Sequence, residues 1–255
     1  MPFERIEPEK LSRAVVRQIE GLVLRGVLRA GERLPSEREL SERLGVSRPS
    51  LREAIAELQD SGLLVARANS GIYVADVLGS AFSPALTRLF SSHEEALFDA
   101  IDFRRDLEGL AAHRAARLAS DTDLRLVNTI FEKMQTAHEK RATADEGRLD
   151  AEFHLAIIEA SHNVILLHMM RSIYDLLQEG VFYNRQVIFD QRTTRSALLD
   201  QHRAINTALQ ARDPEQAQGA VHAHLDFVRA SLSDKLRADR NEANAQKRLE
   251  QEEGR

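Results

Sequence analysis

The stretch LPSERELSERLGVSRPSLREAIAELQDSGLL, residues 34–64, decides the fold of the N-terminal part of the chain. Ser36 can cap a helix, and Glu39 three residues later completes the pattern of a capping box. Gly45 ends that helix, and Ser47 can cap the next one, whose apolar residues recur at helical spacing. Two helices joined by so short a turn indicate a helix-turn-helix.

The residues on both sides of this stretch predict a winged form of the motif. Upstream, apolar residues repeat at helical spacing over 11–27, which predicts a first helix. Downstream, the β-prone runs 63–66 and 72–74 are separated by the polar segment 67–71, a pattern typical of a hairpin. We therefore expect a winged helix-turn-helix of three helices and a two-stranded wing in residues 1–76.

The rest of the chain predicts an all-helical second domain. The periodic pattern weakens over 77–93, where we expect a linker, and residues 237–255 mix charges in what we expect to be a frayed or disordered tail. Between them, residues 94–236 favour a bundle of six helices. These are expected at 94–119, 121–142, 145–161, 163–189, 192–211 and 214–236. The fold class is thus mostly α.

Composition restricts the classes of function. The 255 residues are 43% hydrophobic and 29% charged. They contain no apolar run near the roughly 18 residues that cross a bilayer. With no secretory signal pattern either, we expect a globular cytoplasmic protein without a membrane partner. The chain has no cysteine, so only His, Asp and Glu remain as strong metal ligands.

Arginine placement, and not bulk charge, indicates a nucleic-acid partner. The net charge is -5, and the first 76 residues hold 12 basic and 12 acidic side chains. The start of a recognition helix faces base edges in the major groove. The residues expected there are Ser47, Arg48, Ser50 and Arg52. Arg38 on the preceding helix and Arg67 and Asn69 on the wing are expected at the backbone or minor groove. The alternative for these arginines is an ordinary solvated surface.

The stretch 34–64, followed by a two-stranded wing, resembles the DNA-binding domain of the GntR family of regulators. The resemblance implies double-stranded operator DNA as the partner. It assigns DNA contacts to the wing around Gly71 and to Arg38, Ser47, Arg48, Ser50 and Arg52. The wing tip, Asn69-Ser70-Gly71, departs from the glycine-rich tip of many relatives, but Asn tolerates a positive φ.

Four side chains of the second domain fall on inward helix faces. Asp150 and His154 are four residues apart and share a face. His202 and His224 each continue an apolar series at helical spacing, which predicts that both point into the bundle. One carboxylate and three imidazoles can hold Zn, Ni or Mn with positions left open for a carboxylate ligand. Periodicity alone leaves hydrogen-bonded core histidines as an equal alternative, and it places His222 on the polar side.

Residues 103–225 also resemble the all-helical FCD effector domain of the FadR subfamily. The matching pieces occur in order: R-x-x-L-E at 104–108, D-x-x-F-H at 150–154, S-x-N at 161–163, H-x-x-I at 202–205 and His224-Leu225. The resemblance implies a divalent metal ion, zinc first and nickel or manganese as alternatives. Its ligands would be Asp150, His154, His202 and His224. It further implies that Arg104 pairs with an effector carboxylate, whereas an intrahelical ion pair with Glu108 is the alternative.

A finer resemblance concerns the effector. Residues 159–177 (EASHNVILLHMMRSIYDLL) and 246–251 (QKRLEQ) are similar to the pyruvate dehydrogenase complex repressors and the lactate-responsive regulators. This similarity implies a repressor of central-carbon or organic-acid genes that responds to pyruvate, lactate or glycolate. We further expect a homodimer on a pseudo-palindromic operator, so that symmetry in the protein is mirrored in the DNA. A sugar acid or a fatty-acyl ligand is the alternative.

Two other classes of protein are the alternatives to a regulator. A metal-dependent hydrolase needs a general base beside the metal, and the nearby candidates, Glu152 and Glu159, lie on other faces of their helix. The chain also lacks a phosphate-binding glycine loop and a G-x-S-x-G elbow, so we do not expect an enzyme. The second class is a metabolite-binding protein whose helix-turn-helix contacts another protein.

Overall fold

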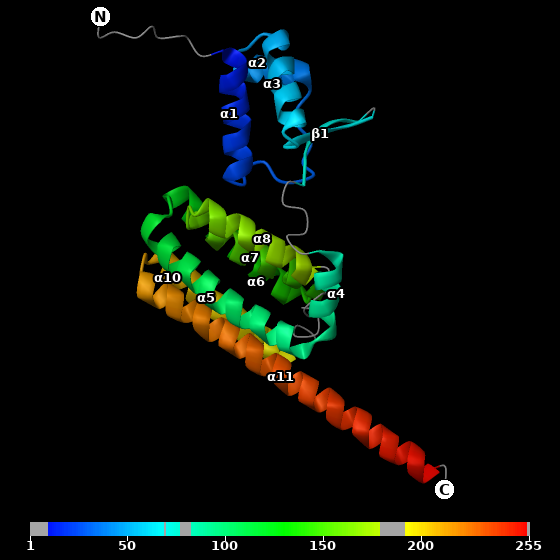
Figure 1. Cartoon of the computed structure of the whole chain (residues 1–255). Coiled ribbons are helices and arrows are strands. Elements are labelled where there is room, and N and C mark those ends of the chain that lie inside the picture. Colours follow the sequence, from blue (N-terminus) through cyan, green and yellow to red (C-terminus); the bar gives the residue numbers. More distant parts are fainter. Residues whose placement is uncertain (1–9, 69, 77–82, 179–191, 254–255) are drawn as a thin grey trace, which may run out of the picture. The chain divides into compact units, whose positions relative to one another are not determined.

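A computed structural model of the chain describes residues 10–68, 70–76, 83–178 and 192–253. The chain divides into two compact units, Met1–Gly79 and Ser80–Arg255 (Figure 1). Each unit has its own cluster of buried apolar side chains. Within the described ranges, no helix has the length and apolar character needed to cross a membrane.

The first unit is a winged helix-turn-helix, which confirms the prediction. Its elements are α1 (Leu11–Leu24), α2 (Glu37–Leu44), α3 (Arg48–Asp60), β1 (Leu64–Arg67) and β2 (Gly71–Val74). The two strands pair antiparallel, with Leu64 opposite Val74. The chain before α2 adds to the outer edge of β2, where the Leu34 N–H donates to the carbonyl of Ile72 at 2.9 Å.

Local sequence explains the turn between α2 and α3. The Ser36 hydroxyl accepts the N–H of Glu39 at 3.3 Å and so caps α2. Gly45 follows α2 with a φ of 65°, a left-handed conformation that glycine adopts without strain. Ser47 then caps α3 by accepting the N–H of Ser50 at 3.3 Å. The two caps fix where each helix begins, and α3 therefore starts at Arg48.

The second unit is helical throughout its described residues. Its helices are α4 (Pro84–Ser92), α5 (Glu94–Leu118), α6 (Asp121–Lys140), α7 (Thr143–Ala160), α8 (Val164–Gln178), α10 (Arg192–Gln210) and α11 (Pro214–Glu253). The helix expected at 163–189 is described as far as Gln178, and its remainder lies outside the described residues. The other helices expected between 94 and 211 match these bounds closely.

Two segments differ from the expectation. A helix, α4, occupies most of the expected linker 77–93, because the Ser83 hydroxyl accepts the N–H of Leu86 at 3.2 Å and proline is favoured in the first turn. The last helix, α11, runs through most of the expected tail to Glu253, beyond the other helices of its unit (Figure 1). Ion pairs one turn apart, such as Lys235–Asp239 at 2.7 Å, support this extension.

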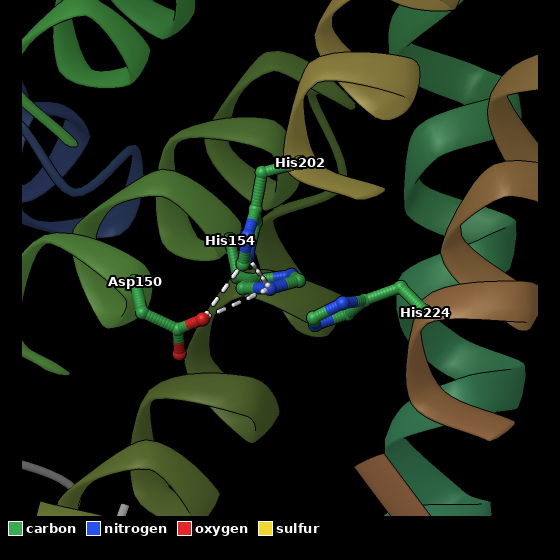
Figure 2. Close-up of side chains that lie close together, drawn as sticks. All are labelled: Asp150, His154, His202 and His224. Carbon is green, nitrogen blue, oxygen red and sulfur yellow. Dashed lines mark hydrogen bonds and ion pairs between the residues drawn. The ribbon is translucent and has the colours of Figure 1, made fainter. Parts of the chain in front are cut away.

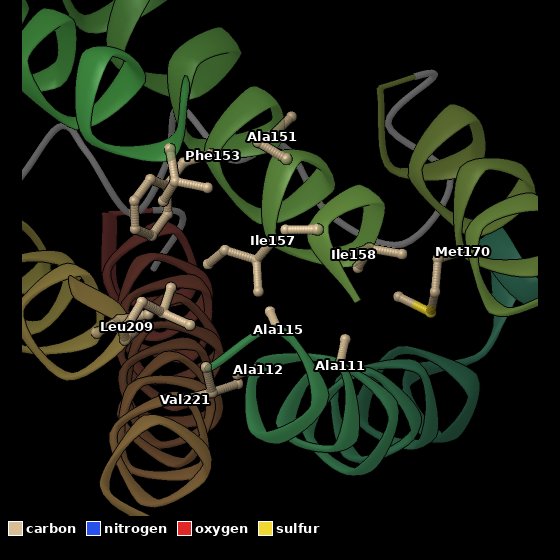
Figure 3. Packing of buried hydrophobic residues seen from close by; sticks show 14 of the residues in the cluster. Ala111, Ala112, Ala115, Ala151, Phe153, Ile157, Ile158, Met170, Leu209 and Val221 are labelled. Carbon is tan, nitrogen blue, oxygen red and sulfur yellow. The ribbon is translucent and has the colours of Figure 1, made fainter. Parts of the chain in front are cut away.

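Small side chains on α5 bring the helices of the core together. Ala111, Ala112 and Ala115 are completely buried. They leave room for larger side chains from neighbouring helices, among them Ile157 of α7 and Val221 of α11 (Figure 3). Close packing of this kind holds backbone positions tightly. It fixes α7, α10 and α11, the three helices that carry the candidate site.

Candidate metal centre and DNA-binding surface

Four buried side chains meet in the core of the helical unit. Asp150 and His154 come from α7, His202 from α10 and His224 from α11, and all four point toward one another (Figure 2). One ligand atom from each residue lies within 4.8 Å of the ligand atoms of the others. The structure therefore brings together the residues that the sequence placed on inward faces.

The ring of each histidine in the cluster is oriented by a hydrogen bond at its Nδ1 atom. The Nδ1 atom of His154 lies 2.8 Å from Oε2 of Glu108. His202 Nδ1 lies 2.7 Å from the carbonyl oxygen of Leu198, and His224 Nδ1 lies 3.0 Å from Oε1 of Gln201. These oxygens only accept hydrogen bonds, so each Nδ1 carries the proton. The Nε2 atoms are then the ones left with a lone pair.

The Nε2 atoms gather around the Asp150 carboxylate. Its Oδ1 lies 3.0 Å from Nε2 of His202 and 3.8 Å from Nε2 of His154. The Nε2 atoms of His154 and His202 are 3.2 Å apart. A carboxylate and unprotonated imidazole nitrogens so close together repel one another unless a cation lies among them.

Burial keeps the imidazoles of His154 and His224 neutral. Desolvation lowers the pKa of His154 by more than the carboxylates of Glu108 and Asp150 raise it. Desolvation, together with the neighbouring histidines, lowers the pKa of His224 well below its ordinary value. Neutral imidazoles whose other nitrogen donates to an oxygen are the usual form of metal-bound histidine. The cluster is therefore compatible with a divalent metal site.

Arg104 lies beside the cluster within a buried network. Its Nε donates to Oε1 of Glu108 at 2.7 Å, and its Nη2 donates to the Tyr174 hydroxyl at 3.2 Å. The same hydroxyl donates to Glu108 at 2.9 Å. Burial raises the pKa of Glu108, but Arg104 and His154 outweigh it and hold that pKa below its ordinary range. The intrahelical ion pair considered from the sequence is thus present, and Glu108 links it to His154.

The remaining sequence candidates lie outside the cluster. Glu152 pairs with Arg148 at 2.5 Å, and Glu159 pairs with Arg171 at 2.8 Å, so neither carboxylate is placed as a base beside the cluster. His222 was expected on the polar side but packs instead against α5. Its Nε2 lies 2.3 Å from where a Cβ on the α5 residue Gly109 would be.

The recognition helix α3 exposes its arginines. Arg48 and Arg52 are both exposed. Nε of Arg52 donates to Oε2 of Glu37 on α2 at 2.8 Å, whereas Arg48 makes no ion pair within the described part of the chain. The hydroxyls of Ser47 and Ser50 lie 2.9 Å apart and bond each other at the start of the helix. Among the described residues, Arg48 can therefore contact DNA without first breaking an ion pair, whereas Arg52 must leave Glu37.

The wing and α2 carry the other sequence candidates. Arg38 is exposed on α2. The guanidinium of Arg67 lies 4.4 Å from the ring centre of Tyr73, a cation–π contact that pre-orients it. Gly71 has a φ of 113°, where other residues are strained. Asn69 lies outside the described residues.

Comparison with known proteins decides the family. Residues 11–74 match the description "Bacterial regulatory proteins, gntR family", and residues 99–227 match the FCD domain. The Glc operon transcriptional activator of Escherichia coli (strain K12) is 34% identical over 231 residues, which are 89% of this chain and 91% of that protein. The chain belongs to the GntR family.

Other GntR proteins agree with this assignment. An Escherichia coli (strain K12) protein, assigned provisionally to regulation of the L-lactate dehydrogenase operon, is 36% identical over 229 residues, 88% of this chain and 87% of its own. The solved Streptococcus agalactiae GntR shares the fold, with a TM-score of 0.50, 24% identity and coverage of 86% of this chain and 99% of that one. The chain is a DNA-binding transcription regulator of the GntR/FCD type, and the expectation of a regulator, not an enzyme, is confirmed.

The functional residues that the sequence did not single out are partners of the predicted ones. Tyr174 bonds both Arg104 and Glu108, and Gln201 holds the ring of His224. Tyr174 lies 70 residues from Arg104 in the chain, too far for helical periodicity to connect them. Gln201 directly precedes His202, and nothing in the spacing assigns it to a histidine of another helix.

Proposed function

We propose that this regulator represses genes of organic-acid metabolism and responds to a small 2-oxo or 2-hydroxy acid through a metal ion. The observation that carries the proposal is the buried set of three imidazoles around Asp150, each with its Nδ1 atom against an oxygen. Ordinary core packing does not require three imidazoles and a carboxylate to meet at one point. The names of the relatives, for the Glc and L-lactate dehydrogenase operons, support an organic acid as the effector.

The proposed metal ligands are Asp150, His154, His202 and His224. Three imidazoles and one carboxylate suit zinc, and also nickel or manganese. When bound, the ion supplies positive charge and open coordination positions for a carboxylate and the adjacent oxo or hydroxyl oxygen. The chain's own contribution is to orient the rings through Glu108, the carbonyl of Leu198 and Gln201.

Arg104 is the proposed partner of the effector carboxylate. Its charge acts on the cluster, since it contributes to the lowered pKa of His224. The guanidinium already bonds Glu108 and Tyr174, which fixes its direction. An effector at the metal would share Arg104 with Glu108, and the binding energy would then depend on how the helices α5 and α7 lie relative to each other.

For DNA, we propose a homodimer that places two α3 helices in successive major grooves of a pseudo-palindromic operator. Base contacts are assigned to Ser47, Arg48, Ser50 and Arg52. Contacts to the backbone or minor groove are assigned to Arg38, Arg67, Asn69 and Gly71. The effector changes operator affinity by binding one arrangement of the dimer better than another, a coupling of about 1–3 kcal/mol in typical cases.

The test is fluorescence anisotropy of the full chain on its own promoter DNA. Pyruvate, L-lactate, glycolate and a long-chain acyl thioester are titrated before and after chelation of metal. The proposal expects one of the small acids to change the operator affinity and chelation to remove that change. Operator binding that responds to the acyl thioester, or to an acid after complete chelation, contradicts the proposed sensor.

A further inference from the structure

Two arginines share the outer face of the wing. In the pairing of β1 with β2, Arg67 lies opposite Gly71. Arg33, in the segment before α2, forms a bridge with Tyr73, two residues further along β2. Residues directly opposite each other, and alternate residues of one strand, place their side chains on the same face of a sheet. Arg33, Arg67 and Tyr73 therefore lie on one face.

The other face of this small sheet is turned to the core. Leu34, Leu64 and Val74 are buried in the apolar cluster of the first unit. Arg33 and Arg67, by contrast, are exposed. The wing projects from the three helices of its unit (Figure 1), so a partner can reach its outer face.

Gly71 leaves the space in which the Arg33 side chain lies. Nε of Arg33 is 3.1 Å, and its Nη2 3.5 Å, from the position that a Cβ on Gly71 would take. On the same face, the guanidinium of Arg67 lies 4.4 Å from the ring centre of Tyr73. Both side chains are thus packed along the wing, which reduces the conformational entropy that each loses when it binds a ligand.

The two cations have no neutralising group beside them. Within the described residues, neither Arg33 nor Arg67 pairs with a carboxylate. Residues 61–75, which contain both strands, include no Asp or Glu. Glu32 directly precedes Arg33, but its carboxylate accepts the N–H of Arg29 at 3.0 Å. Two unneutralised cations on one face raise the local positive potential and attract an anion.

We propose that Arg33 binds a backbone phosphate of the operator. The chain is a DNA-binding regulator, and a guanidinium can bind a phosphate through two parallel N–H bonds. Because every base pair carries the same phosphates, the contact adds affinity without base preference. Gly71 then has a further role, since its lack of a side chain lets Arg33 lie across the wing. The inference goes beyond the DNA contacts assigned above and depends on neither the metal nor the effector.

A phosphate contact has a measurable signature in the salt dependence of binding. Each phosphate that a protein neutralises adds about 0.9 to the slope of log affinity against log salt concentration. If Arg33 makes one such contact, Arg33→Gln lowers the slope by about 0.9 for each bound chain. The matching loss of affinity per chain is about eightfold at roughly 0.1 M salt and about twofold at roughly 0.45 M.

The experiment is fluorescence anisotropy of the full chain on its promoter DNA and on a scrambled duplex of equal length, over a range of KCl concentrations. Arg33→Gln removes the charge, and Arg33→Lys keeps it. Arg25→Gln is the matched control, because Arg25 is also exposed and lies across a glycine, but at the end of α1. Its Nη2 is 2.8 Å from the position of a Cβ on Gly21. The thermal midpoint of each variant reports whether its fold is intact.

We expect Arg33→Gln to weaken binding to both duplexes by the same factor, with the slope lowered by about 0.9 per chain and the thermal midpoint unchanged. Arg33→Lys should recover most of the slope, because an ammonium also neutralises a phosphate. Arg25→Gln should bind both duplexes as wild type does.

An unchanged salt slope in Arg33→Gln overturns the inference, and a lower thermal midpoint with that result would mean that Arg33 only stabilises the wing. A loss of affinity confined to the operator would assign Arg33 to base recognition and also contradict a phosphate contact. An equal loss of slope in Arg25→Gln would show an effect of net charge and not of a contact at Arg33. In each of these cases wild type still binds the operator, so the proposed recognition by α3 stands and the Arg33 contact alone fails.

Discussion

The Nε2 atoms of His154 and His202 lie 3.2 Å apart in the core, although each ring places its Nδ1 against an oxygen acceptor. Two lone pairs therefore face each other with the carboxylate of Asp150 beside them. A proton on one ring would relieve the repulsion, but burial lowers the pKa of His154 and opposes it. A divalent cation would relieve it without that cost, which supports the proposed metal site.

His202→Ala should abolish tight metal binding. The substitution removes one of four ligands and leaves the others in place, so we expect the affinity for zinc to fall by at least the roughly 100-fold that loss of an outer-shell contact can cause. Metal content after dialysis, measured by atomic emission, checks this. His113→Ala is the control, because His113 lies on α5 and pairs only weakly, at 3.9 Å, with Glu215. Equal metal content in the two variants would remove His202 from the site.

Gln201→Leu should weaken metal binding without removing a ligand. It takes away the oxygen that accepts from Nδ1 of His224 at 3.0 Å, so the ring loses its fixed orientation. Loss of such a partner typically costs about 10–100-fold in metal affinity. Zinc titration against a competing chelator measures the change. Gln210→Leu, a substitution on the same helix away from the cluster, should match wild type, and a Gln201 variant that also matches it would show that the contact does not orient the ring.

The metal-free protein should lose stability as the pH falls below about 6.5. The folded state keeps His154 and His224 neutral because their pKa values are lowered, whereas the unfolded chain takes up protons on both. Each histidine then removes up to about 1.4 kcal/mol of unfolding free energy per pH unit. Urea unfolding between pH 8 and pH 5.5 measures the slope.

The slope has a matched control. His224→Asn should reduce the slope, because it removes one of the two histidines with a lowered pKa. His113→Ala should leave the slope unchanged. An unfolding free energy that is constant from pH 8 to pH 5.5, or that rises as the pH falls, would contradict the lowered pKa values of His154 and His224.

Arg48→Ala should weaken operator binding by about 1–3 kcal/mol and relax the base preference at one position of each half-site. Arg48 is exposed at the start of α3 and makes no ion pair in the described residues. The measurement is anisotropy on operator and scrambled DNA at several salt concentrations. Arg203→Ala, which removes an exposed charge from the helical unit, should bind as wild type does. Unchanged discrimination between the two DNAs would take Arg48 out of base recognition.

Short-range sequence patterns predicted the helices whose start is marked by a capping residue. Ser36 and Ser47 are caps that are visible in the sequence, and both form. The helix α4 has the same signal, Ser83-Pro84, but the weak periodicity around it favoured a linker. For α11 the sequence pattern ended with the apolar residues, whereas the helix continues on ion pairs and good helix-forming residues.

Helical spacing predicted which side chains of the site share a face or point inward, but not which side chains from different helices meet. Asp150 and His154 could be joined because they are four residues apart, and His202 and His224 because each continues an apolar stripe. Arg195 and Glu146, which form a buried ion pair, are 49 residues apart, and the packing of α10 on α6 and of α6 on α7 brings them together. The partners of the predicted residues depend on tertiary contacts, which no periodicity encodes.

The most direct test of the central claim is a titration of the metal-free chain with Co²⁺, followed by pyruvate, L-lactate and glycolate, read by visible absorption. We predict that one ion binds per chain, and that one of the acids changes its spectrum at concentrations that also change operator affinity. A chain that binds no Co²⁺ at micromolar concentration, or a bound spectrum that none of the three acids alters, would contradict a metal-centred acid sensor.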